Sequence, residues 1–276
     1  MSTQKIVLVT GCSKGGIGFS LCEAYAAQGC VVYATARRPE AMEGFRDPSK
    51  IRALKLDVLS DENVHDVVKT IIDREGRIDI LVNNAGSAAP GAMLDLTIDE
   101  ARRAFEINTF SVLTVSKAVA PYMAQRKSGT IVNIGSIAAE FPTPWAGIYS
   151  ATKAAMHMIT DTLWMECQPL GINVTLVAPG AVISNISVNA HPLLKIPENT
   201  LYRDYIPQIM RRLNVSQNAA SSMNTDEFAR RVAKETVRKN PPRYLTLGGA
   251  STLFKIFVWL PRVWVLKLLW WRFSKP

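Results

Sequence analysis

Residues 5–18 read KIVLVTGCSKGGIG, and this stretch decides the fold because it joins a strand to a glycine-rich turn. The β-branched run before Gly11 is typical of a buried strand in a parallel sheet. The residues that follow, 19–28, are predicted to form a helix that ends at Gly29. Strand, glycine-rich turn and helix in this order indicate a dinucleotide site, where glycines let the backbone approach a pyrophosphate and the helix N-terminus faces it.

The residues after the second predicted strand favour one cofactor over another. Residues 31–36 form that strand and end at Arg37 and Arg38, where an NAD site would prefer an acidic residue for the ribose hydroxyls. Arginine instead pairs with a 2′-phosphate through a bidentate fork, and Lys14 in the turn can add a second positive charge. The alternative is that both arginines only solvate a loop. We therefore predict NADP(H) as the cofactor.

Two further strand ends carry candidate cofactor contacts. Asp57 follows a predicted strand at residues 54–56 and can accept from the adenine amino group. Another strand, residues 80–82, leads into the sequence NNAG, in which Asn84 is placed to lie near the cofactor ribose and to hold the strand ends together. For Asn84 the structural role is the favoured interpretation.

Ser136, Tyr149 and Lys153 together describe a way to move a proton onto a carbonyl. Tyr149 and Lys153 are four residues apart, which on a helix puts both side chains on one face. A phenol titrates near pH ~10, and a neighbouring ammonium favours the phenolate and is expected to lower the pKa of Tyr149. Ser136 can hold the substrate oxygen. Tyr-x-x-x-Lys alone also occurs by chance on surface helices, so the rest of the chain decides the interpretation.

The chain resembles the short-chain dehydrogenase/reductase family over roughly residues 5–250. The matching motifs, in order, are the glycine turn, Asp57, Asn83-Asn84-Ala85-Gly86, Asn108, Ser136, Tyr149, Lys153 and Pro179-Gly180. The resemblance implies an α/β fold, a doubly wound parallel sheet of Rossmann type in a single domain. One departure is visible, because four residues instead of three separate Gly11 from Gly16. Which backbone amides meet the phosphates is therefore open.

The resemblance also implies roles for individual residues. Tyr149 is the general acid for carbonyl reduction, Lys153 lowers its pKa and binds the nicotinamide ribose, Ser136 positions the carbonyl, and Asn108 anchors a water. The implied cofactor-binding residues are Gly11, Ser13, Lys14, Gly16, Ile17, Gly18, Arg37, Arg38, Asp57, Asn84, Tyr149, Lys153, Val182 and Ser184.

Composition narrows the remaining classes. The 276 residues suffice for one large α/β domain, here residues 1–250, and neither the four cysteines nor the three histidines have metal-like spacing. We therefore expect no metal, no structural disulfides and a reduced intracellular setting, and the short segment before the first strand leaves no room for a secretory signal. The net charge is +9, yet no basic patch coincides with a nucleic-acid motif, so nucleic acid is not an expected partner.

Residues 251–276 form a tail that differs from the rest of the chain. The tail holds four of the six tryptophans and five cations, with no acidic residue. A charge every few residues and a helix-breaking Pro261 argue against a spanning helix, whereas Trp, Lys and Arg favour the headgroup level. We expect two short segments, hinged at Pro261, in one leaflet at the cytosolic face of the endoplasmic reticulum or a lipid droplet. The alternative is a helix pair that packs on the enzyme or in a dimer interface, and a homo-oligomer stays open.

The segment at about 184–224 occupies the position of the family's substrate lid, and it mixes apolar residues with Lys195, Arg203, Arg211 and Arg212. This pattern suits a long-chain lipid carrying a phosphate, or an ordinary amphipathic helix. The glycine turn, the Arg37-Arg38 strand end, Pro241-Pro242-Arg243-Tyr244 and the tail resemble the fungal NADPH-dependent 1-acyldihydroxyacetone-phosphate reductases. We therefore predict NADPH-dependent reduction of a lipophilic ketone, with 1-acyldihydroxyacetone phosphate, reduced to 1-acylglycerol 3-phosphate, as the leading substrate.

Other functions stay open on the same sequence. Retinoid, steroid and secondary-metabolite ketoreductases share the broader pattern. A non-catalytic, cofactor-binding scaffold on lipid droplets is a rival from another class, although such a binder would not need Tyr149. An epimerase or dehydratase is disfavoured by the spacing of Ser136 and by the hydrophobic tail.

Overall fold

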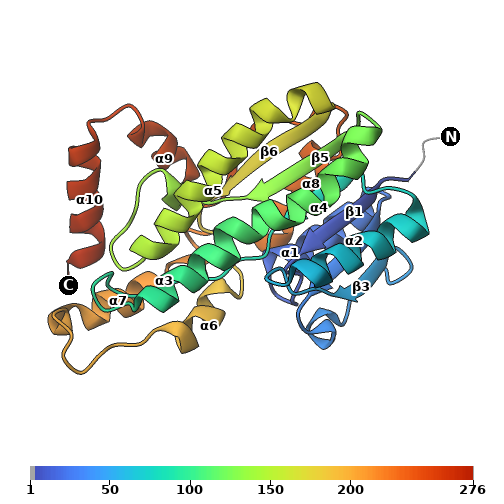
Figure 1. The fold of residues 1–276 in the computed structure, drawn as a ribbon. Coiled ribbons are helices and arrows are strands. Elements are labelled where there is room, and N and C mark those ends of the chain that lie inside the picture. The colour runs from blue at the N-terminus through green and yellow to red at the C-terminus, as the bar shows by residue number, and fades with distance from the viewer. Residues whose placement is uncertain (1–3, 276) are drawn as a thin grey trace.

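The computed structural model describes residues 4–275 and shows a central sheet with helices on both faces (Figure 1). The strands are β1 (Ile6–Thr10), β2 (Val31–Ala36), β3 (Ile51–Lys55), β4 (Ile80–Asn83), β5 (Gly129–Ile134), β6 (Ile172–Pro179) and β7 (Tyr244–Leu247). They pair in parallel in the order β3-β2-β1-β4-β5-β6-β7. The predicted doubly wound, Rossmann-type sheet in a single domain is confirmed. Its order reverses between β1 and β4, which places a ligand crevice at the carboxyl ends of the strands.

The α-helices lie between the strands in the sequence, and two more come after β7. They are α1 (Ile17–Ala27), α2 (Asp61–Glu75), α3 (Ile98–Phe105), α4 (Ser111–Gln125), α5 (Gly147–Glu166), α6 (Ile186–Ala190), α7 (Ile206–Leu213), α8 (Thr225–Thr236), α9 (Ser251–Phe257) and α10 (Arg262–Ser274). The first helix begins at Ile17, two residues earlier than predicted, because Gly16 has extended backbone angles and serves as its N-cap. The predicted start of α8 at Thr225 is confirmed, with the Asn224 side chain as its cap.

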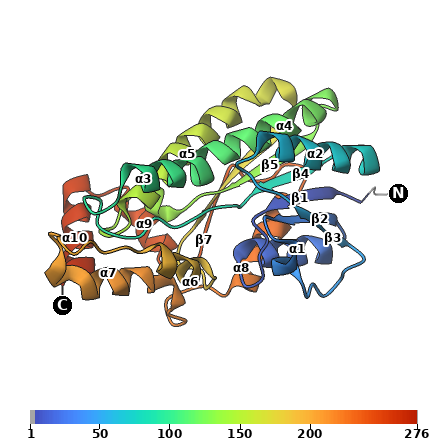
Figure 2. The same ribbon diagram turned by 60° about the horizontal axis from the view of Figure 1, so that its bottom comes forward.

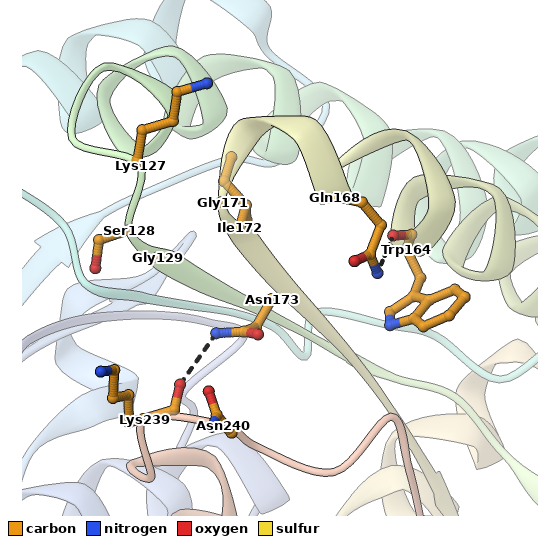
Figure 3. A pocket seen from close by; sticks show the side chains of 10 residues that line it. All are labelled: Lys127, Ser128, Gly129, Trp164, Gln168, Gly171, Ile172, Asn173, Lys239 and Asn240. Atoms are coloured by element: carbon orange, nitrogen blue, oxygen red, sulfur yellow. Dashed lines mark hydrogen bonds between the residues drawn. The ribbon is translucent and has the colours of Figure 1, made fainter.

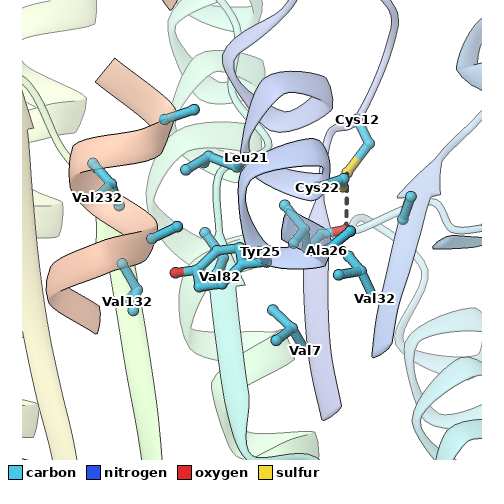
Figure 4. Close-up of a cluster of buried hydrophobic side chains, with 14 of the residues drawn as sticks. Val7, Cys12, Leu21, Cys22, Tyr25, Ala26, Val32, Val82, Val132 and Val232 are labelled. Carbon is cyan, nitrogen blue, oxygen red and sulfur yellow. Dashed lines mark hydrogen bonds between the residues drawn. The ribbon is translucent and has the colours of Figure 1, made fainter. Parts of the chain in front are cut away.

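Two apolar layers enclose the sheet. On one face, α1 and α8 cover the strands, and Figure 4 shows Leu21 and Tyr25 of α1 with Val232 of α8 in this layer. On the other face, α2 and α4 pack over the alternate residues of the same strands, among them Leu8 and Leu81. The period-2 alternation of a strand buried on both faces explains the near-continuous apolar run before Gly11.

The tail folds as two short helices separated by Pro261. Figures 1 and 2 show α10 at the end of the molecule away from β1, with its last turn beside α7. The inward faces of α9 and α10 bury Phe254, Phe257, Val265 and Leu269 against Phe141 and Ile137. Within residues 4–275, no helix is both long enough and apolar enough to cross a membrane.

Candidate active site

One face of α5, the catalytic stripe, carries the predicted acid Tyr149 together with Lys153 and His157. Tyr149, Lys153 and His157 succeed one another at intervals of four residues, so their side chains lie on one face of the helix. Lys153 is 6 % exposed, and its Nζ donates to the Ile134 carbonyl at the end of β5 over 2.9 Å. The same Nζ lies 6.0 Å from the centre of the Tyr149 ring. A parallel strand end thus fixes the lysine beside the phenol.

His157 holds Ser136 in place, and the sequence interpretation missed it. Its Nε2 accepts from the Ser136 backbone N–H over 3.2 Å, and a Cβ on Gly135 would lie 2.2 Å from the same nitrogen. Burial and, to a smaller extent, the charge of Lys153 lower the pKa of His157 to about 4. The imidazole is therefore neutral at pH 7 and can accept this bond. Its position four residues after Lys153 was the available signal.

The Ser136 hydroxyl lies beside Tyr149 and has one proton to donate. It is buried at the carboxyl end of β5, and its Oγ accepts from the Ala138 N–H over 3.1 Å. A hydroxyl is one donor and two acceptors, so the O–H can still donate to a carbonyl oxygen. A hydrogen bond from the Ser136 hydroxyl lowers the pKa of Tyr149, so Ser136 O–H is the donor to the phenol oxygen, and a bound carbonyl would take over this bond. The two predicted catalytic residues, far apart in the sequence, meet in the structure.

Asn108 lies in a π-helical turn, residues Glu106–Phe110, between α3 and α4. Its Oδ1 accepts from the Ser87 N–H over 2.8 Å, and its Nδ2 donates to the Ser87 carbonyl and to Thr152 Oγ1. Such single π turns are frequent at functional sites. The amide therefore links the loop after β4 to α5. Only the second lone pair of Oδ1 remains for the predicted water, so that role stays a prediction.

Lys153 does not lower the pKa of Tyr149 as the sequence interpretation expected. Burial raises the pKa of Tyr149, while the Ser136 hydrogen bond and the charge of Arg212 lower it. The ammonium of Lys153 is directed to the Ile134 carbonyl, and burial lowers the pKa of Lys153 itself to about 8. The phenol is accordingly protonated at neutral pH, the state required of a proton donor.

The glycine turn fits a pyrophosphate, and the extra residue has a physical explanation. Gly15 has a φ of +77°, the left-handed region that favours glycine, and the Gly16 N–H donates to the Ser13 carbonyl over 3.0 Å. The added residue thus makes a tight turn and occupies the Gly16 amide. The N-terminus of α1 has no side-chain cap, so the N–H groups from Ile17 onward are left for an anion.

Close packing makes the turn rigid. A Cβ on Gly18 would lie 2.4 Å from the Gly11 carbonyl oxygen. Asn84 Nδ2 donates to the Thr10 and Gly11 carbonyls over 2.8 and 3.0 Å. The Asn84 side chain thus connects the end of β4 to the turn after β1. This geometry supports a structural role for Asn84.

The other predicted cofactor residues lie at neighbouring strand ends. Arg37 and Arg38 are exposed just beyond β2, and no carboxylate among residues 4–275 forms a salt bridge with either. Asp57 follows β3 and accepts from the Leu59 N–H over 3.1 Å, which turns the chain there. Val182 and Ser184 are buried just after β6. The set fits a dinucleotide with a 2′-phosphate. A separate surface pocket at the amino ends of β5 and β6 contains none of these residues (Figure 3).

The family model described as short chain dehydrogenase matches residues 5–192. The chain belongs to this family. A short-chain dehydrogenase of Penicillium crustosum is 35 % identical over 256 residues, with 92 % of each chain covered. An NADPH-dependent 1-acyldihydroxyacetone phosphate reductase of Schizosaccharomyces pombe is 34 % identical, covering 78 % of this chain and 73 % of that one.

Two more relatives extend the comparison. A 3-ketodihydrosphingosine reductase of Bacteroides thetaiotaomicron is 33 % identical, and the match covers 93 % of each chain. The crystal structure of a short-chain dehydrogenase from Streptomyces avermitilis superposes with a TM-score of 0.81 at 31 % identity, covering 99 % of this chain and 97 % of that one. This short-chain dehydrogenase is therefore an oxidoreductase of the class that interconverts alcohols and carbonyls.

Proposed function

We propose that this short-chain dehydrogenase reduces a lipophilic ketone to a secondary alcohol with NADPH, and that its leading substrate is 1-acyldihydroxyacetone phosphate, which would give 1-acylglycerol 3-phosphate. The observation that carries the reaction is the protonated Tyr149 phenol beside the Ser136 hydroxyl at the carboxyl ends of the strands. The Schizosaccharomyces pombe relative, named for this substrate and for NADPH, supports the choice of both.

Each residue of the centre has a separate task. NADPH, when bound, supplies the hydride. Ser136 Oγ–H donates to the substrate oxygen and holds it near Tyr149, and Tyr149 gives that oxygen its proton. Lys153 Nζ is held by the Ile134 carbonyl, 6.0 Å from the centre of the phenol ring, and we assign it to the nicotinamide ribose. For NADPH itself we assign the α1 N-terminus to the pyrophosphate and Arg37 and Arg38 to the 2′-phosphate.

The lid supports a lipophilic substrate. Between β6 and α8, the apolar side chains of Leu194, Tyr202 and Tyr205 pack with Trp145 and Ile209. Trp145 belongs to the loop that joins Ser136 to Tyr149, so the lid packs its apolar side chains on the catalytic loop. Substrates with a long acyl chain fit such an apolar lid better than a sugar nucleotide does.

We further propose that the tail docks the enzyme on an anionic membrane surface, at the cytosolic face of the endoplasmic reticulum or a lipid droplet. The turn between α9 and α10 exposes Trp259 (88 %), and the outward face of α10 exposes Trp264 (67 %) and Trp271 (53 %). Monomeric soluble proteins rarely expose contiguous apolar patches of this kind. Five cations and no acid accompany them in residues 251–276, which suits lipid phosphates.

The deciding experiment follows NADPH oxidation by the full-length protein in liposomes. Palmitoyl-dihydroxyacetone phosphate is compared with retinal and with steroid ketones at equal surface concentration. Preference for the phosphate lipid supports the leading substrate. Activity on the phosphate-free ketones alone would contradict it and favour a retinoid, steroid or secondary-metabolite ketoreductase. Lasting NADPH binding with turnover of no ketone would favour the cofactor-binding scaffold instead.

A further inference from the structure

The four lid cations differ in what they contact. Three are exposed and bind protein groups outside the site: Lys195 to Glu100, Arg203 to the Glu198 carbonyl and Arg211 to the Lys275 carbonyl. The fourth, Arg212, points inward from the last turn of α7 and is half-buried. Its inward direction and partial burial set Arg212 apart from the other three.

Two distant segments hold the Arg212 guanidinium. Its Nε donates to Thr143 Oγ1 over 2.7 Å, and Thr143 is a buried residue of the loop between Ser136 and Tyr149. The guanidinium carbon lies 5.6 Å from the centre of the Phe273 ring in α10, a cation–π distance. The lid, the catalytic loop and the tail thus meet at this one side chain.

The charge of Arg212 has no acidic partner in the described structure. None of the salt bridges among residues 4–275 includes it, and Nε is its one donor that meets a hydrogen-bond acceptor within those residues. A guanidinium has five N–H donors, so both Nη groups remain for a ligand. Removing a cation from water without an anion is unfavourable, and burial accordingly lowers the pKa of Arg212. A bound anion would balance the charge of Arg212 and accept from its Nη groups.

We propose that Arg212 binds the acidic group of the substrate, a phosphate before a carboxylate, while Ser136 and Tyr149 hold its ketone. The inference rests on the proposed function and specifies which end of the substrate the lid recognises. The planar fork of arginine matches two phosphate oxygens. Arg212 is near enough to Tyr149 for its charge to act on the phenol, so the acid belongs within a few bonds of the carbonyl.

The same charge discriminates against other lipid ketones. A ketone that carries an ammonium, such as 3-ketodihydrosphingosine, would place like charges together. A neutral ketone would leave the Nη donors without an acceptor. Only an acidic ketone satisfies the guanidinium, and 1-acyldihydroxyacetone phosphate carries its phosphate on the carbon next to the carbonyl.

The test compares two substrates that differ in the phosphate alone: palmitoyl-dihydroxyacetone phosphate and palmitoyl-dihydroxyacetone. In the full-length enzyme, Arg212→Gln should lower kcat/KM for the phosphate ester about 100-fold and for the neutral ketone by less than about threefold, because a buried charge pair is lost only with the former. Arg212→Lys should fall between wild type and Arg212→Gln. Arg203→Gln, an exposed lid cation, is the matched control and should leave both values unchanged. Equal losses on both substrates would overturn the proposal.

A binding measurement keeps the inference testable apart from turnover. With NADP⁺ bound, 1-palmitoylglycerol 3-phosphate and 1-palmitoylglycerol are titrated into wild type and Arg212→Gln in the same detergent micelles. Wild type should bind the phosphate ligand at least tenfold more tightly, and the variant should lose that difference while its melting temperature stays near that of wild type. Preference without turnover would retain the anion site and reject the proposed substrate. No preference in wild type would overturn the anion site.

Discussion

The catalytic centre and the substrate end of this enzyme are built in opposite ways. Around α5, the polar groups near Tyr149 satisfy one another: Lys153 binds the Ile134 carbonyl and His157 binds the Ser136 N–H. At the junction of lid and tail, Arg212 keeps unused donors, and the tail exposes tryptophans to solvent. A centre whose polar groups bind one another does not specify a substrate. An unpaired charge and exposed apolar side chains, in contrast, indicate what this enzyme recognises.

The two regions also differ in how far apart their residues lie in the sequence. Residues of the catalytic stripe succeed one another along one helix, so local spacing brings them together. The substrate end joins α7, the loop at Thr143 and α10, which are separated by scores of residues in the chain. The spacing along α5 therefore accounts for Tyr149, Lys153 and His157, whereas the surroundings of Arg212 depend wholly on long-range packing.

The largest expected effect is a loss of ketone reduction without a loss of NADPH binding. Tyr149→Phe removes the proton donor and should lower kcat on every accepted ketone about 1000-fold, since general acid catalysis contributes on that order. NADPH affinity, measured by fluorescence titration, should change little. Tyr122→Phe, in the last turn of α4 that leads to the amino end of β5, is the control and should keep full activity. A Tyr149→Phe enzyme with near-full activity would contradict the assignment of the acid.

The tail prediction compares the exposed tryptophans, which are expected to bind membranes, with the buried residues that pack on the enzyme. Replacing Trp259, Trp264 and Trp271 by Ser should lower binding to anionic vesicles about 100-fold, because three large apolar side chains leave the interface. Activity on a substrate in detergent should persist. Deleting residues 251–276 is a cruder test, because it also uncovers Phe141 in the catalytic loop.

The matched control for the tail is Leu269→Ala on the inward face, where Leu269 is buried. It should lower the melting temperature and keep vesicle binding, because the cavity lies between the tail and the enzyme. Unchanged sedimentation of the triple tryptophan variant with vesicles would contradict the membrane proposal and favour a tail that serves only packing or a protein interface.

A smaller effect is expected at the cofactor end. Replacing Arg37 and Arg38 together by Gln should raise KM for NADPH about 30-fold and leave KM for NADH nearly unchanged, because only NADPH presents a 2′-phosphate to them. Lys50→Gln, a charge outside the predicted contacts, is the control. If KM for both cofactors rises alike, the arginines act on the loop and not on the phosphate.

The smallest effect concerns pH and His157. Its folded pKa of about 4 lies below the usual value of 6.5, so the unfolded chain binds more protons between these values. Stability is then full above about pH 6.5 and falls as the pH drops toward 4, by about 2 kcal/mol from pH 7 to pH 5. Urea unfolding of wild type against His157→Gln, which keeps an acceptor without the titration, should show the difference. Parallel pH curves would exclude this role for His157.

The sequence predicted what depends on local pattern. The strand before Gly11, the sheet it belongs to and the start of α8 at Thr225 are confirmed, since alternation, glycine and capping residues act over a few positions. The start of α1 was displaced because the extra Gly15 moves the cap to Gly16.

Long-range contacts account for what was missed. His157 was set aside for lacking metal-like spacing, although its place four residues after Lys153 indicated the catalytic face. The lid cations looked alike in the sequence, and only the contacts to Thr143 and Phe273 distinguish Arg212. The role assigned to Lys153 also differed, because the direction of its Nζ depends on the Ile134 carbonyl.

Isotope transfer tests the proposed reduction most directly. The full-length protein in liposomes would be given palmitoyl-dihydroxyacetone phosphate and NADPH deuterated at the reactive nicotinamide carbon, with mass spectrometry of the lipid product. NADPH-dependent ketone reduction predicts 1-palmitoylglycerol 3-phosphate with one deuterium on the former carbonyl carbon from wild type, and almost none from Tyr149→Phe. Product without deuterium, or equal yields from the two proteins, would contradict it.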